Sequence, residues 1–186
     1  MPLPQEDKKY TYKDYMTWPD EEHWEIIDGV PYMQAAPSWQ HQAVLVELSR
    51  QFSNYFVNKS CKVFAAPFDV CLEESEDSRQ VVQPDIVIVC DPSKLKKTGY
   101  FGIPSLVVEI VSPSTARIDR ITKFNKYKNV GVKEYWIIEP IDKIIQVFTL
   151  LDDKSYKMEI YEEDDKTIDV YLFPGLQIDI TTIFPE

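Results

Sequence analysis

Two nearly continuous apolar runs constrain the fold more than any other feature of this sequence. They are residues 81–90 (VVQPDIVIVC) and 105–112 (SLVVEIVS). A strand that faces water on one side alternates apolar and polar residues, whereas a nearly unbroken apolar strand is covered on both faces. The two runs therefore predict the centre of a sheet that has helices on each side.

Periodicity and end signals predict the helices. Apolar residues recur at three- and four-residue steps after Ser38, which can cap the helix that they predict. A later helix can be capped by Ser114 or Thr115 and is expected to end at Gly131. The expected helices cover residues 10–18 (stopped by Pro19), 38–58 and 114–129.

The remaining segments favour strands. Asp28-Gly29 separates two extended apolar runs, which is a strong signal for a β-hairpin. Further strands are expected at 61–72, 132–139 and 143–151, and the late runs 157–163 and 167–173 are expected to form an antiparallel edge. Together these segments predict an α/β fold with a mixed sheet, organised as a single domain over residues 1–186.

Charge and composition limit the class of protein. The chain has 186 residues, 44% of them hydrophobic, which excludes a disordered chain. Its 20 basic and 31 acidic residues give a formal charge of −11, so it is not a generic nucleic-acid coat protein. A basic groove or a metal-filled acidic site can still meet a phosphate, because net charge says little about one cleft.

The cysteines and the N-terminus bear on location. Cys61, Cys71 and Cys90 are odd in number, lie in apolar strand-like runs and lack C-x-x-C spacing. We interpret them as reduced core thiols of a cytoplasmic protein rather than as zinc ligands or disulfide partners. The polar N-terminus predicts no signal peptide, and no apolar run is long enough to cross a membrane.

Two acidic residues stand out because they lie within the most hydrophobic runs. Asp85 precedes IVIVC, and Glu109 shares one strand face with Val107 and Val111. An ionised carboxylate in such a strand costs several kcal/mol unless it is paired, hydrogen-bonded or bound to a metal. Two of them, 24 residues apart on strands that can be neighbours, suggest a shared divalent cation.

A helical stripe supplies a third element. Asp119, Lys123 and Tyr127 follow one another at four-residue steps on the helix that comes directly after the Glu109 strand. Lys123 can therefore reach the carboxylates, although Asp119 and Lys123 can equally form a surface pair worth a few tenths of a kcal/mol. A further alternative is that the acids and Lys123 form a structural ion pair without metal. Nearby basic residues, Arg117, Arg120, Lys126 and Lys128, could contact a phosphate backbone or face the protein's own acids.

An ordered set of motifs resembles a known family. WEIIDG, His41, PDIVIV, LVVEIVSPST, D-x3-K-x3-Y and GVKEYWIIEP follow one another between about residue 10 and residue 150. This succession resembles the Uma-type restriction endonuclease family, which is placed in the PD-(D/E)xK nuclease superfamily. The resemblance implies a restriction-endonuclease-like core, with a central mixed sheet flanked by helices.

The same resemblance implies a metal site and an activity. Asp85 and Glu109 match the metal-binding acids, and Glu25 matches a third acid that comes from an element before the sheet. Val111 stands where the superfamily has its lysine, and Lys123 matches the position to which related families move it. The expected cofactor is Mg²⁺ or Mn²⁺, held by Asp85, Glu109 and Glu25 as hard oxygen ligands.

The expected function is metal-dependent hydrolysis of phosphodiester bonds in DNA. Lys123 would stabilise charge or orient the attacking water. His41 is expected near the pocket, positioning water or a ligand residue, or else as an ordinary polar residue on the first turn of a helix. Tyr127 would bond the lysine or a carboxylate, or simply pack. The alternative is an inactive nuclease-fold module that binds or regulates. Cutting both strands asks for two sites, so a homodimer is expected, with the late β-hairpin region as its candidate interface.

Overall fold

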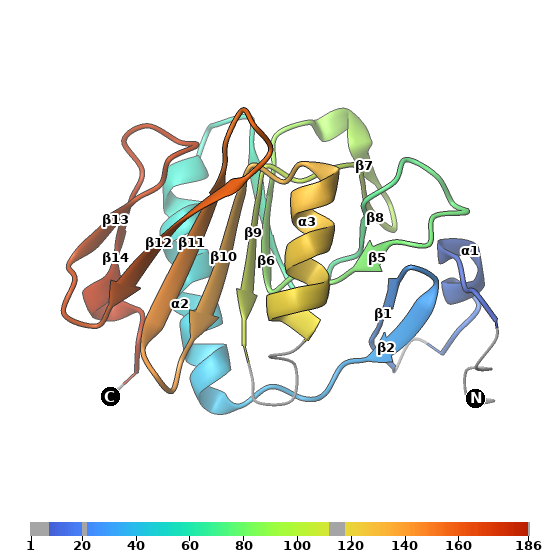
Figure 1. Cartoon of the computed structure of the whole chain (residues 1–186), viewed down its shortest axis with the longest axis horizontal. Helices are drawn as coiled ribbons and strands as arrows, with labels where there is room; N and C mark the ends of the chain where they lie inside the picture. The colour runs from blue at the N-terminus through green and yellow to red at the C-terminus, as the bar shows by residue number, and fades with distance from the viewer. Residues whose placement is uncertain (1–7, 20–21, 112–117, 186) are drawn as a thin grey trace.

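The computed structural model describes residues 8–19, 22–111 and 118–185 and has a six-stranded mixed sheet at its centre (Figure 1). Strands β9 and β10 are parallel, and every other neighbouring pair in this sheet is antiparallel. The order is β12 (Tyr156–Glu162), β11 (Ile144–Leu150), β10 (Glu134–Glu139), β9 (Leu106–Ile110), β6 (Ile86–Val89) and β3 (Lys62–Ala65). The predicted mixed α/β class is confirmed.

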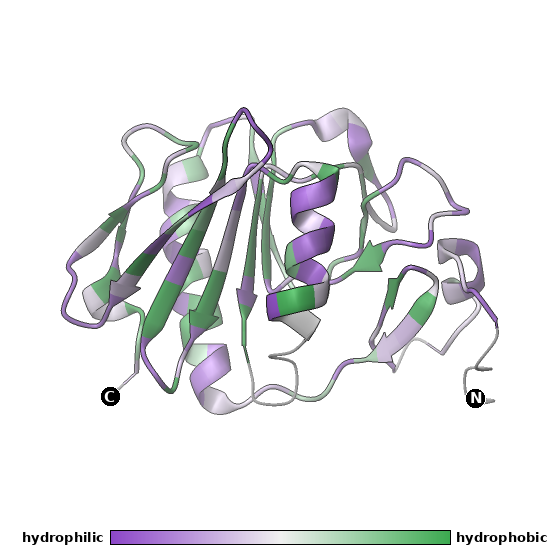
Figure 2. Ribbon diagram, in the orientation of Figure 1, coloured by the Kyte–Doolittle hydropathy of each residue, from purple (hydrophilic) through white to green (hydrophobic). Residues whose placement is uncertain are grey.

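Helices cover both faces of this sheet, as the continuous apolar runs predict. Helix α2 (Trp39–Phe56) lies behind the sheet in Figure 1, and α3 (Phe124–Val130) lies in front of it. The π-helical segment η2 (Ile118–Lys123) leads directly into α3. Figure 2 shows that the side of α3 turned towards the viewer is mostly hydrophilic, while the strands beneath it carry long hydrophobic stretches.

The residues of β9 alternate between two cores, which confirms the predicted side-chain alternation. Leu106, Val108 and Ile110 pack in the cluster that includes Val44, Leu48 and Phe52 of α2. Val107 and Val111 pack in the second cluster, with Tyr127 of α3. Glu109 therefore lies on the α3 side of the sheet.

A second six-stranded sheet holds the N-terminal hairpin. Its order is β2 (Val30–Met33), β1 (Trp24–Ile27), β5 (Val81–Val82), β4 (Val70–Cys71), β8 (Gly99–Phe101) and β7 (Leu95–Lys96). The hairpin predicted at Asp28-Gly29 is confirmed, and both residues adopt the positive φ that a type I′ turn requires. Helix α1 (Tyr12–Tyr15) and the 3₁₀ turn η1 (Pro92–Lys94) are short.

The sequence pattern suggests one strand over residues 81–90, but the structure divides this apolar run between two strands. Its first residues form β5 in the second sheet, and its last residues form β6 in the central sheet. Pro84 lies between the two strands and has no N–H for a strand ladder, so the chain can change sheets there. Asp85 consequently lies at the junction, directly before β6.

The late segments differ from the expected single edge. Strand β12 is the edge of the central sheet, antiparallel to β11. In contrast, β13 (Thr167–Asp169) pairs with β14 (Gln177–Asp179) as a separate hairpin, followed by the 3₁₀ turn η3 (Ile180–Thr182). The physical reason is that Ile168 and Ile178 bury themselves in the α2 cluster. The buried Glu134 carboxylate also accepts hydrogen bonds from Trp136 Nε1 and the Leu172 N–H.

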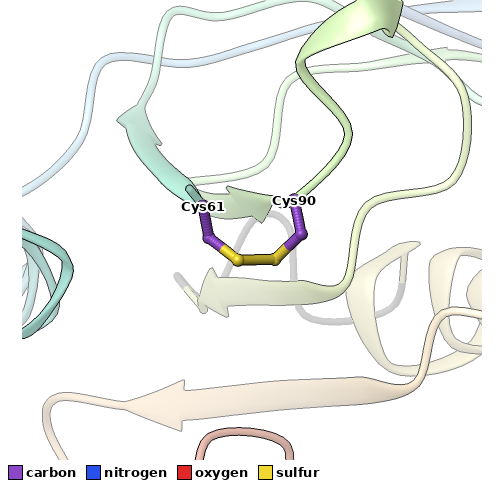
Figure 3. The surroundings of a disulfide bond; sticks show 2 residues. All are labelled: Cys61 and Cys90. Atoms are coloured by element: carbon purple, nitrogen blue, oxygen red, sulfur yellow. A yellow bond between two sulfur atoms is a disulfide. The ribbon is translucent and has the colours of Figure 1, made fainter. Parts of the chain in front are cut away.

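The interpretation of all three cysteines as reduced thiols is wrong for two of them. Cys61 and Cys90 form a disulfide (Figure 3). The pairing of Lys62 with Val89 places the two cysteines opposite each other at the next position, with Cα atoms 4.0 Å apart. Cys71 is a free, buried thiol whose pKa is raised by burial. The cytoplasmic location stays a prediction.

The membrane expectation can be examined on the helices. Within the described ranges, no helix has both the length and the apolar character needed to cross a bilayer. The caps expected at Ser114 and Thr115 lie outside the described residues. The predicted helix end at Gly131 is confirmed, because this residue is left-handed and its N–H bonds back to Tyr127 and Lys128 carbonyls.

Candidate active site

The register of β6 and β9 places the two acids at the same end of neighbouring strands. Ile86 pairs with Val108 as the last pair of the antiparallel ladder, so Asp85, directly before β6, and Glu109, directly after Val108, lie at this end, and both line one cavity. Asp85 is further fixed because its Oδ2 accepts the Ile110 N–H at 2.7 Å. The structure therefore brings together the two carboxylates that the sequence placed on neighbouring strands.

Glu109 is bound by two side chains from the α3 side. Lys123, the last residue of η2, places its Nζ 3.0 Å from Glu109 Oε1. Tyr127, one turn further on, donates its hydroxyl to the same oxygen at 2.8 Å. Burial, with the Glu109 charge adding to it, raises the pKa of Tyr127 well above its usual value. Tyr127 therefore stays a protonated donor at neutral pH.

Glu25 joins this group from the second sheet. Its Oε1 lies 2.9 Å from Lys123 Nζ and accepts the Gln83 N–H at 2.7 Å. Glu25, Glu109 and Lys123 are each only 3% exposed, so the ammonium lies buried between two carboxylates. We call these three residues the carboxylate–lysine cluster. It is built from β1, β9 and the end of η2, which are far apart in the sequence.

His41 contacts the other acid. It lies on the first turn of α2, where Ser38 caps the helix by accepting the His41 N–H. Its Nε2 lies 3.1 Å from Asp85 Oδ1, whereas its buried Nδ1 has no hydrogen-bond partner in the part of the chain that the structure describes. The structure thus places His41 beside the candidate site rather than on the outer surface of the helix.

Five of these six residues line one cavity of about 510 Å³: Glu25, His41, Asp85, Glu109 and Lys123. Tyr127 lies behind Glu109 and is not part of the lining. It lies between α2, the N-terminal hairpin and the ends of β6 and β9, and its lining includes His23, Tyr32 and Gln83. Three carboxylates and one ammonium give it a formal charge of −2 when the histidines are neutral. An anionic phosphate would be repelled from such a cavity unless a cation is also present.

The basic residues of the following helix are paired with acids of the protein itself. Arg120 forms an ion pair with Glu139, and Lys126 Nζ lies 2.6 Å from Asp28 Oδ1. The hydrogen bond from Lys126 is the main reason why the pKa of Asp28 lies below its usual value. Of the two alternatives for this helix face, the pairing with local acids therefore holds at Arg120 and Lys126. Arg117 and the Asp119 side chain lie outside the described residues.

Comparison with known proteins identifies the family. The sequence model of the Uma2 family, described as "Putative restriction endonuclease", matches residues 12–181. This chain belongs to the Uma2 family. The resemblance inferred from the ordered motifs is thereby confirmed.

Relatives of this Uma2 chain include two uncharacterized proteins of Synechocystis sp. One is 28% identical over 162 residues, covering 85% of this chain and 83% of the relative. The other is 24% identical over 141 residues, covering 75% and 71%. A crystal structure of "a putative nuclease belonging to DUF820" from Anabaena variabilis has a TM-score of 0.74 at 18% identity, covering 94% of this chain and 97% of that one. The latter similarity confirms the nuclease-like fold.

Two features of this Uma2 site were not found from the sequence. Gln83, which bonds Glu25 through its N–H, lies in an apolar run, and only its position before the Pro84 break could have drawn attention to it. The Ile110 N–H that holds Asp85 carries no sequence signal. In the described part of the chain, no three His, Cys, Asp or Glu side chains are arranged to hold a metal by themselves.

Proposed function

We propose that this protein is a metal-dependent endonuclease that hydrolyses phosphodiester bonds in DNA. The observation that carries the proposal is that Asp85 and Glu109, at the same end of neighbouring strands, line one cavity together with Lys123. Membership of the Uma2 family and the nuclease-like fold support it. The cavity provides acids for a cation and an ammonium for a phosphate in one place.

The donor set fits Mg²⁺ or Mn²⁺. These ions prefer carboxylate oxygens, and Mg²⁺ usually binds through one or two carboxylates while keeping several waters. Asp85 and Glu109, with Glu25 as a third acid, would hold the ion, so a cage of three close protein ligands is not required. A divalent cation would also offset the −2 charge of the cavity. When bound, such an ion polarises a phosphoryl oxygen and lowers the pKa of a coordinated water.

The protein's own groups would then position the reactants. Lys123 would stabilise the negative charge that develops on the phosphoryl oxygens, because its ammonium is buried and fixed by two carboxylates. Tyr127 would hold Glu109 in place as a neutral donor. His41 would orient Asp85 through Nε2 while the Ile110 N–H fixes the other oxygen.

A homodimer would supply the two sites needed to cut both strands. The edge strand β12 supports this, because in the described structure it pairs only with β11. Its Met158 and Ile160 side chains are 51% and 53% exposed. Pairing of β12 with its copy in a second chain would satisfy its free edge and cover these side chains.

An inactive nuclease-fold module is the second candidate. The observation that favours it is the engagement of Lys123 by two carboxylates at 2.9 and 3.0 Å, which is also what a purely structural ion cluster would look like. In that case the cavity would bind nucleic acid or a regulator without hydrolysing it.

A plasmid-nicking assay separates the two candidates. We expect the wild type to nick supercoiled DNA with Mg²⁺ or Mn²⁺ and not with EDTA, and we expect Asp85→Asn and Glu109→Gln to lose roughly 100-fold or more of the rate. Glu163→Gln is the matched control, because this acid lies on the surface and pairs with Lys143. Equal nicking rates for the wild type and all three variants would refute the proposal that the protein is an enzyme.

A metal titration followed by thermal melting adds a readout independent of cleavage. The wild type should be stabilised by Mn²⁺, while Asp85→Asn should lose this stabilisation and Glu163→Gln should keep it. A protein that neither nicks DNA nor responds to metal would be the inactive module.

A further inference from the structure

A second cavity of about 410 Å³ adjoins the candidate active site and has no role in the proposed hydrolysis. Its walls include three aromatic side chains, Tyr15, Trp18 and Phe68. Asp69 and Gln83 supply polar groups, and the exposed Lys97 lies at the cavity as well. Aromatic walls with a few polar groups are typical of a site for a flat, partly polar ligand.

The two cavities are connected through shared residues. His23, Pro67 and Gln83 line both of them. Gln83 bridges the two directly, because its backbone N–H bonds Glu25 of the cluster while its side-chain Nε2 donates to Asp69 Oδ1 at 2.7 Å. A ligand that passes Gln83 would therefore have one part at the carboxylate–lysine cluster and the next part against the aromatic walls.

The polar end of the second cavity has hydrogen-bonding capacity left over. Gln83 is only 4% exposed, and its buried Oε1 has no partner within the described residues. Asp69 uses Oδ1 for Gln83 and Tyr15, whereas its Oδ2 accepts no hydrogen bond from any residue that the structure describes. Gln83 Oε1 calls for a ligand that presents an N–H group, because a buried unpaired acceptor is unfavourable. Asp69 is only partly buried, and its Oδ2 offers a second acceptor beside it.

We propose that this second cavity binds an unpaired nucleobase of the nucleic acid whose phosphate lies at the carboxylate–lysine cluster. This inference rests on the proposed function and names the substrate class more closely: single-stranded DNA, or a duplex with a base extruded beside the scissile phosphate. A base would stack on Trp18, Tyr15 or Phe68, and its amino or imino N–H groups would face Gln83 Oε1 and Asp69 Oδ2. A base inside a duplex is stacked and paired, so it cannot enter such a pocket without leaving the helix.

The charge state of Asp69 is compatible with this ligand. Burial raises the pKa of Asp69 above its usual value, with Gln83 and Tyr15 hydrogen bonds opposing the rise. A carboxyl group of this kind can accept from a base amino group and, when protonated, donate to a base carbonyl or ring nitrogen. The neighbouring Lys97 carries a charge that suits the phosphate next to the bound base.

The first experiment changes the ligand and leaves the protein intact. Anisotropy in Ca²⁺ or EDTA would compare wild-type binding of a labelled single-stranded 12-mer, the same strand with abasic sites, and the corresponding duplex. We expect the abasic strand and the duplex to bind roughly 5- to 150-fold more weakly than the intact strand, as loss of one base–aromatic stack implies. Equal affinity for all three, or no binding to any, would overturn the inference.

The second experiment changes the cavity. Trp18→Ala should bind the intact strand more weakly than the wild type by the same factor. It should also abolish the quenching of a 2-aminopurine base in that strand. Trp39→Ala is the matched control, because Trp39 is 62% exposed and lines neither cavity. Since Trp18 packs on Tyr10, Tyr15 and Trp24, Asp69→Asn provides a second variant if Trp18→Ala melts early. Variants that bind and quench as the wild type does would overturn the inference.

These readouts do not depend on cleavage. A protein that nicks duplex plasmid yet binds intact and abasic strands equally would keep the proposed function and lose this inference. A protein that binds the base as expected but never cleaves would keep the inference for an inactive module.

Discussion

Replacing Lys123 by methionine tests the electrostatics of the site most directly. Methionine keeps much of the length of the side chain but removes the ammonium that lies 2.9 and 3.0 Å from Glu25 and Glu109. Two carboxylates, each 3% exposed, would then face each other without a cation. Lys126→Met is the matched control, because it makes the same change one turn along the same helix and breaks a pair with the exposed Asp28.

The expected magnitudes differ because the burial differs. Breaking a buried ion pair on one side costs about 3–5 kcal/mol, whereas an exposed pair is worth about 0–1 kcal/mol. For a chain of this size, about 1 kcal/mol corresponds to roughly 2–4 °C in Tm. Lys123→Met should therefore lower Tm by roughly 6–20 °C and Lys126→Met by at most about 4 °C.

The assay is a pair of thermal melts, with EDTA and with Mn²⁺. In EDTA the two variants should separate as stated. In Mn²⁺ the Lys123→Met protein should regain more stability than the wild type does, because a divalent cation can replace the ammonium between the carboxylates. Equal melting of Lys123→Met and Lys126→Met would refute the reasoning. If Mn²⁺ does not reduce the loss of Tm in Lys123→Met, the conclusion would be that the three residues form an ion cluster with no affinity for metal.

Three further changes test other parts of the structure by thermal melting. Reduction of the Cys61–Cys90 disulfide, which spans 29 residues, should cost about 3–4 kcal/mol, and an unchanged Tm in reductant would contradict this bond. Glu134→Gln should cost about 1–3 kcal/mol, because each carboxylate oxygen accepts one N–H and the amide would turn a donor towards one of them; a variant as stable as the wild type would argue against this anchor. Folding lowers the pKa of Glu47 to about 2, mainly through its bonds to Arg50, so its contribution to stability is full above about pH 4.5 and is lost as the pH falls towards 2. The Tm difference between wild type and Glu47→Gln should accordingly shrink over that range, and a constant difference would be the contrary result.

The sequence predicts the centre of the fold and the two neighbouring strands beside which its acids lie, because both depend on local patterns. Continuous apolar runs require cover on two faces, and α2 and α3 provide it. The alternation along β9 predicts that Glu109 faces the opposite side of the sheet from Val108 and Ile110, and the structure has this arrangement. The four-residue spacing of Lys123 and Tyr127 predicts that both face one side of the helix, and both bond Glu109.

What the sequence does not predict depends on register and on long-range contacts. The disulfide requires Cys61 and Cys90 to stand opposite each other, which follows from the β3–β6 ladder and not from their spacing. The division of residues 81–90 between two sheets likewise depends on which strand each half meets. The separate β13–β14 hairpin depends on burial of Ile168 and Ile178 against α2, a contact between segments far apart in the sequence that no local pattern reveals.

The position of the lysine on a helix has a structural consequence for the site. Val111, on the same strand face as Glu109, packs with Tyr127 in the apolar core, so the strand supplies no charge there. The ammonium instead comes from the end of η2, and its position depends on how α3 docks. That docking is fixed at the N-terminal hairpin in two places, by Lys123 with Glu25 and by Lys126 with Asp28. The hairpin, the helix and the two central strands must therefore be assembled before the acids and the lysine can meet, which ties the chemistry of this cavity to the folding of the whole α3 side.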